Sequence, residues 1–105
     1  MSIPYQLTDI APLVSHTREQ FLRKEEGRIR SQATSLLAAG KPDPSITAAL
    51  DAAIFAEDLH EIHDETAKHY AQKGVPHRAE IHDRYARQAL QLKLRALDQL
   101  SHLVI

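Results

Sequence analysis

The sequence predicts an all-α protein, a three-helix bundle built on a long antiparallel helical hairpin that dimerises into a larger helical bundle. Apolar residues recur at spacings of three and four, and no run alternates as a strand would. Two of the three glycines, Gly40 and Gly74, each lie just before a proline. A glycine followed by a proline is typical of one helix ending and another beginning. We therefore predict a single domain spanning residues 1–105, with helices over 9–39, 44–73 and 76–104.

The first predicted helix has a less regular pattern than the other two. Its inner stripe consists of Val14, Phe21, Leu22, Ile29, Ala33 and Leu36. Arg18, Glu25 and Gln32 recur every seven residues within or beside that stripe. We expect such polar residues to bond to a partner across a helix contact, or to pack their stems at its edge.

The second predicted helix begins with Asp43 as its N-cap and Pro44 in its first turn. It has two parallel stripes. The first consists of Ala48, Ala52, Phe55, Leu59, Ile62, Thr66 and Tyr70. The second consists of Ala49, Ala53, Ala56, His60, His63 and Ala67. Two adjacent stripes predict a helix that packs against more than one neighbour.

The third predicted helix follows a turn at Gly74-Val75-Pro76, which makes it the second arm of the hairpin. Toward its end the apolar arc becomes wider than a lone hairpin could cover. This excess predicts an intermolecular contact, and we expect a homodimer. The predicted oligomer interface consists of Leu94, Leu97, Leu100, Leu103 and Val104.

Composition excludes several classes of protein. The chain has no cysteine, which rules out disulfides and thiolate chemistry. It has no apolar run long enough to span a membrane and no secretory leader, so we expect a cytoplasmic protein. Its 13 basic and 14 acidic residues give no overall attraction to nucleic acid. The charge is uneven, however, with two basic and seven acidic residues in 43–73 between two basic flanks. This pattern favours complementary packing of neighbouring helices.

Histidines and carboxylates gather near the predicted turn, where five of the seven histidines lie between residues 60 and 82. Counting back from the turn brings His63 and His82 together between the two arms. The candidate metal ligands are His60, His63, His82, Glu57 and Asp64. Imidazole and carboxylate would suit a divalent transition metal such as zinc, nickel or iron. Two alternatives use the same residues, namely hydrogen-bonded packing and a stability that depends on pH near neutrality.

No catalytic or cofactor-binding signature accompanies these features, so the sequence argues against an enzyme. A basic stretch holds Arg23, Lys24, Arg28 and Arg30, but glutamates interrupt it and no aromatic platform accompanies it. Nucleic-acid binding is therefore disfavoured. The function predicted is a small helical protein–protein interaction or regulatory module that acts as a homodimer. The alternative is a transition-metal-binding helical bundle.

Overall fold

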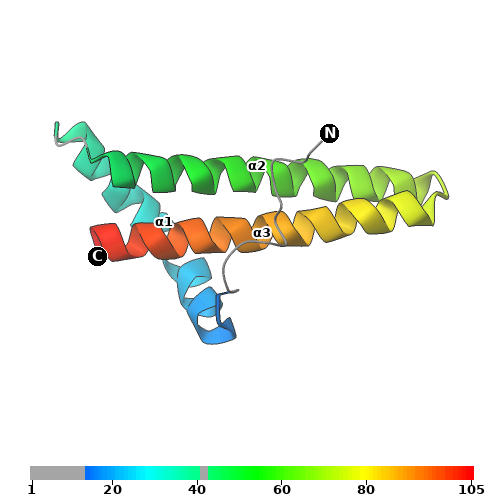
Figure 1. The fold of residues 1–105 in the computed structure, drawn as a ribbon, viewed down its shortest axis with the longest axis horizontal. Coiled ribbons are helices and arrows are strands. Elements are labelled where there is room, and N and C mark those ends of the chain that lie inside the picture. The colour runs from blue at the N-terminus through cyan, green and yellow to red at the C-terminus, as the bar shows by residue number, and fades with distance from the viewer. Residues whose placement is uncertain (1–13, 41–42) are drawn as a thin grey trace.

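Three α-helices and no strand make up the described part of the chain, which confirms the all-α, three-helix prediction. The computed structural model describes residues 14–40 and 43–105. The helices are α1 (His16–Ala38), α2 (Pro44–Gln72) and α3 (Pro76–Val104). Helices α2 and α3 lie side by side and antiparallel along the whole length of the molecule, as Figure 1 shows.

The turn between α2 and α3 confirms the predicted hairpin. Gly74 has φ = 75°, a left-handed conformation that glycine adopts without the steric penalty of a Cβ atom. The Val75 amide donates to the carbonyl of Tyr70 at 2.9 Å, and Pro76 begins α3. At the start of α2 the Asp43 carboxylate accepts a hydrogen bond from the Ser45 amide at 2.9 Å, as expected for an N-cap.

Helix α1 begins later than predicted, at His16 rather than near residue 9. Ser15 has an extended backbone, and its hydroxyl accepts a hydrogen bond from the Arg18 amide at 3.2 Å, so it is the N-cap. Residues 9–13 of the predicted helix lie outside the described residues.

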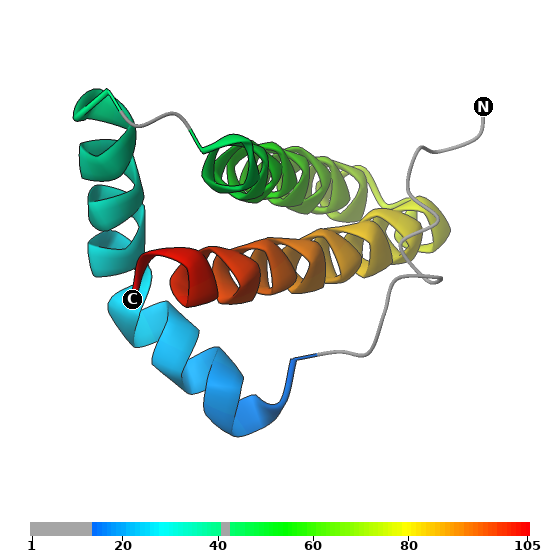
Figure 2. The ribbon, with the colours of Figure 1, turned by 60° about the vertical axis from the view of Figure 1, so that its left-hand side comes forward.

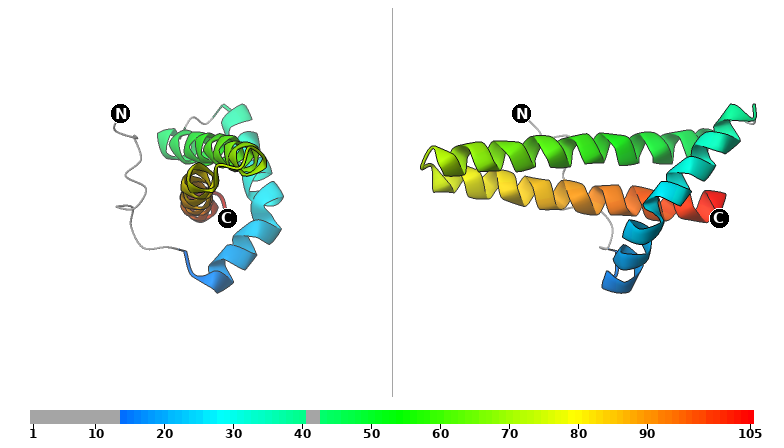
Figure 3. Two further views of the ribbon diagram at one scale, coloured as in Figure 1. Left: turned by 90° about the vertical axis from the view of Figure 1, so that its right-hand side faces the viewer. Right: turned by 180° about the vertical axis from the view of Figure 1, so that it is seen from behind.

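Helix α1 crosses the hairpin steeply near the end where α2 begins and α3 finishes (Figures 2 and 3). We call this the open end, and the region around Gly74 the turn end. Of the described residues, only those of α2 and α3 form helices in the half of the hairpin nearer the turn end. The three helices therefore share a core at the open end alone.

Small residues allow α2 and α3 to lie close together. Ala53 and Ala56 of α2 and Ala89 of α3 are fully buried. At the open end larger side chains from all three helices join them. This shared core consists of Leu22, Ile29, Ala33, Ile46, Ala49, Ala53, Leu94, Ala96, Leu97 and Leu100.

Candidate functional site

The leucines predicted to form an oligomer interface are mostly covered by the chain itself. Leu94, Leu97 and Leu100 are at most 2% exposed and lie in the core that α1 closes. Val104 packs against that core, and Leu103 is 39% exposed. The wide apolar arc of α3 therefore belongs largely to the contact with α1, and of the five predicted interface residues only Leu103 is substantially exposed.

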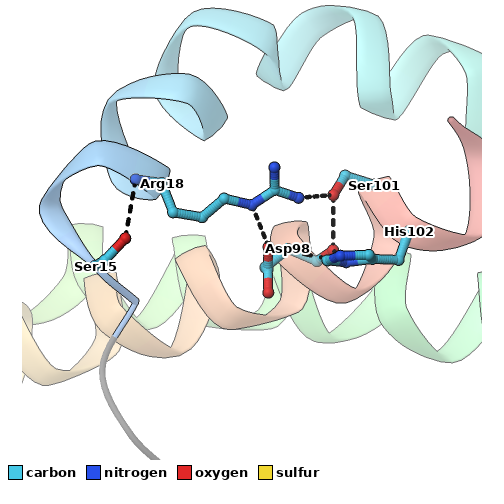
Figure 4. A network of polar contacts seen from close by, with 5 residues as sticks. All are labelled: Ser15, Arg18, Asp98, Ser101 and His102. Carbon is cyan, nitrogen blue, oxygen red and sulfur yellow. Dashed lines mark hydrogen bonds and ion pairs between the residues drawn. The ribbon is translucent and has the colours of Figure 1, made fainter.

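A polar network fixes α1 to α3 beside this core (Figure 4). The Arg18 guanidinium donates from Nε to Asp98 Oδ1 at 2.5 Å and from Nη2 to Ser101 Oγ at 2.6 Å. These three residues are half-buried or buried. Arg18 thus bonds across a helix contact, as its place in the predicted inner stripe suggested.

The predicted meeting of His63 and His82 is confirmed. Their Nδ1 atoms lie 3.0 Å apart, and the ring centroids are 5.3 Å apart with planes 26° from parallel. Because the nitrogens are much closer than the centroids, the rings meet edge to edge. One Nδ1 can carry a proton and donate it to the lone pair of the other. Tyr70 and Tyr85 flank the pair, with centroids 5.6 Å from His82 and 5.3 Å from His63.

This geometry suits a shared proton better than a metal ion. A tetrahedral zinc ion about 2.0–2.1 Å from each imidazole nitrogen would hold the two nitrogens roughly 3.3 Å apart. The 3.0 Å between the two Nδ1 atoms is somewhat shorter and is an ordinary hydrogen-bond length. Burial, and then the charge on His82, lower the pKa of His63. Two positive charges on the pair would repel each other and would remove the lone pair that accepts the hydrogen bond.

The other three candidate ligands have different partners. His60 Nδ1 lies 2.9 Å from the carbonyl oxygen of Ala86, and Asp64 forms an ion pair with Lys68 at 3.0 Å. Glu57 bonds to Arg30 at 2.8 Å. Within residues 14–40 and 43–105 no three histidine or acidic side chains converge as a metal site. Of the predicted cluster, the structure brings together only the two histidines.

Glu57 belongs to an ionic network that joins all three helices. Arg30 of α1 contacts Glu26 at 3.0 Å as well as Glu57, and Lys93 of α3 lies 3.1 Å from Glu26 and 3.8 Å from Glu57. The hydrogen bond from Arg30 lowers the pKa of Glu57, burial opposes this shift, and the charge of Lys93 reinforces it. The sequence did not identify this network, because Arg30 and Glu57 are joined only by the crossing of α1.

The predicted basic stretch of α1 is largely neutralised by carboxylates. Arg23 pairs with Glu19 at 3.2 Å, and Arg28 pairs with Glu25 at 2.9 Å. Together with the pairs of Arg30, these contacts leave little unopposed positive charge on α1.

Large exposed apolar side chains also lie along one side of the hairpin. The second predicted stripe of α2 faces α3, whereas most of the first stripe is left uncovered by the other described residues. Phe55 and Ile62 are 53% and 58% exposed, although Tyr70 at the end of the stripe stacks on His82 of α3. Leu59 follows Glu57 by two residues, or about 200° around the helix, so it points away from α1. Leu92 likewise lies two residues from Leu94, which is in the core that α1 closes, so Leu92 also points away from α1. The contact between His63 and Tyr85 lies on the side of the hairpin that faces away from α1.

We call this surface the outer hairpin face. It consists of Ala48, Ala52, Phe55, Leu59, Ile62 and Thr66 of α2 with Ile81, Tyr85, Gln88 and Leu92 of α3. A surface pocket near the turn end is lined in part by Ile62, Thr66 and Tyr70. The face runs over most of the hairpin, including the half that α1 does not reach.

Fold and surface together define an all-α protein whose described residues form three helices, with a crossed hairpin and an apolar face that these helices leave uncovered. Comparisons with protein-family models, curated proteins and solved structures give no match to this chain. In the described part of the chain, no helix has a stretch long and apolar enough to cross a membrane.

Proposed function

We propose that this chain is a small helical interaction module that acts as a homodimer through the outer hairpin face. The observation that carries the proposal is the exposed row of apolar side chains at helical spacing on α2. Exposed apolar patches of this extent, bordered by polar residues, are typical of protein contacts.

The arrangement of α1 supports a contact at this face. Helix α1 covers one side of the hairpin at the open end, and Phe55 and Ile62 lie on the other side. A two-helix hairpin packed against a second hairpin forms a four-helix core, which buries apolar rows on both. The proposal keeps the predicted homodimer but moves its main surface from the end of α3 to α2 and the adjacent side of α3.

Replacing two apolar residues of the face with acids tests the proposal. We expect Phe55→Glu/Ile62→Glu to elute from gel filtration as a monomer with unchanged helical circular dichroism, because buried carboxylates would oppose the contact. Ile54→Glu is the matched control, since Ile54 is 39% exposed but about 100° away around α2. The control should still elute as a dimer. If the wild type, the double variant and the Ile54→Glu control all elute at the same volume, the outer hairpin face is not the dimer contact.

A further inference from the structure

The two edges of the outer hairpin face carry opposite charge. The outer edge of each helix is the edge of the face that lies farther from the other helix of the hairpin. Along the outer edge of α2, Asp51, Asp58 and Glu65 recur every seven residues and are exposed. Along the outer edge of α3, Arg84 and Arg95 recur on one side of the helix. Within the part of the chain that the structure describes, none of these five residues enters an ion pair. The apolar face thus lies between an acidic edge and a basic edge.

The charged residues also match in position along the hairpin. The contacts of His60 with Ala86 and of Glu57 with Lys93 fix which parts of α2 and α3 lie level. They place Asp51 level with the turn of α3 that begins at Arg95. The contact of His63 with His82 places Glu65 within about one helical turn of the level of Arg84. Within one chain the width of the hairpin separates Asp51 from Arg95. It separates Glu65 from Arg84 in the same way.

We propose that two copies pack face to face about a two-fold axis parallel to the hairpin, so that α2 of each copy lies over α3 of its partner. This inference rests on the proposed function, because it assumes that the outer hairpin face is the dimer contact. Rotation about such an axis leaves each residue at its own level. Asp51 therefore meets the Arg95 of the second copy, and Glu65 meets its Arg84. Leu59 and Leu92 lie near the centre of the contact.

The other face-to-face arrangement is disfavoured by the same charges. A two-fold axis perpendicular to the helices would lay α2 over α2, which places one acidic edge along the other. Like charges at a helix contact are destabilising, and opposite charges at its edges select partner and orientation. Because one edge of the face is acidic and the other is basic, the face complements a second copy of itself only when α2 of each copy lies over α3 of the other.

Charge reversal tests the pairing. We expect Glu65→Arg and Arg84→Glu each to raise the dimer dissociation constant about tenfold at low salt, because each creates two repulsive contacts per symmetric dimer. Mixing the two variants should restore affinity, since the heterodimer has opposite charges at both contacts. Added salt should weaken both effects. Arg87→Glu is the control, because Arg87 pairs with Asp83 in its own chain at 2.8 Å, and it should not restore binding by Glu65→Arg.

Orientation can be measured independently of affinity. The chain has no cysteine, so Lys73→Cys gives a single spin-labelling site at the turn end. The proposed axis places both turn ends at the same pole, so electron–electron distances well below 40 Å are expected. A perpendicular axis would separate the labels by about the length of a 29-residue helix, roughly 43 Å, or more. A dimer that shows the longer label distance, or whose affinity is not restored when the two charge variants are mixed, overturns the proposed packing but not the proposed homodimer. A monomeric wild-type chain overturns the proposed function itself.

Discussion

The open end and the turn end of the hairpin are held together by different interactions. At the open end three helices bury leucine and isoleucine side chains and are joined by ionic contacts from Arg18 and Arg30. Toward the turn end the described residues form two helices, which meet through alanines and the His63–His82 pair, and Ile62 is exposed beside that pair. The open end thus has a core that the chain's own three helices close, whereas the large apolar side chains Phe55 and Ile62 on the outer hairpin face are more than half exposed.

Large-to-small substitution should separate the two regions most clearly. Leu97→Ala removes a fully buried side chain of the shared core, and we expect it to lower the free energy of unfolding by about 2–5 kcal/mol. Ile62→Ala, at 58% exposure, should cost under about 1 kcal/mol at protein concentrations too low for dimerisation. Urea unfolding of both variants measures the difference. Equal losses would contradict the contrast between the regions.

The histidine pair should make the turn end sensitive to mild acid. The pKa of His63 is lower in the folded protein than its ordinary value of 6.5, so the unfolded chain binds more protons as pH falls below about 6.5. Stability is then fully present above that pH and is lost as pH falls toward the folded pKa. The nearby carboxylates Asp64 and Asp83 form ion pairs with Lys68 and Arg87 in their own helices.

Urea unfolding from pH 8 to pH 5 checks this prediction. His63→Gln should lose about 1 kcal/mol at pH 8, because a hydrogen bond is disrupted, and should show a weaker decline toward pH 5. His77→Gln, at an exposed position, is the control and should follow the wild-type curve. An unchanged decline in His63→Gln would rule out the pair as its source.

The ionic network of the open end should respond at lower pH. Arg30 and Lys93 lower the pKa of Glu57, so its contribution to stability is present above about pH 4.5 and is lost as pH falls through the folded pKa. Because about a third of the Glu57 side chain is exposed, we expect Glu57→Gln to cost about 1 kcal/mol or less at pH 7. Thermal unfolding at pH 7 and pH 3 tests this, and the difference between the two proteins should shrink at pH 3.

Metal addition should have the smallest effect. With Glu57, His60 and Asp64 engaged elsewhere, only two of the five predicted ligands remain together. We expect no measurable shift in the melting temperature of untagged protein on addition of zinc, nickel or iron(II). A shift that disappears in His82→Gln would instead support the metal-binding alternative.

The hairpin could be predicted because its determinants are local. Gly74 and Pro76 mark the turn, and counting residues back from them brought His63 to His82. The two stripes of α2 were also visible, since helical periodicity appears in the sequence of one segment.

Features that depend on the angle between helices could not be predicted. The apolar arc around Leu97 required a cover, but the pattern of one helix does not tell whether α1 or a second chain provides it. The pairing of Arg30 with Glu57 likewise depends on where α1 crosses the hairpin. The predicted start of α1 near residue 9 was too early, because the Ser15 side chain caps the helix at His16.

The solution mass of the wild-type chain tests the central claim most directly. Light scattering coupled to gel filtration, at tens of micromolar protein and neutral pH, should give twice the chain mass of 11.8 kDa. In the same measurement Phe55→Glu/Ile62→Glu should give the mass of a single chain. A wild-type mass of 11.8 kDa under these conditions would contradict the account.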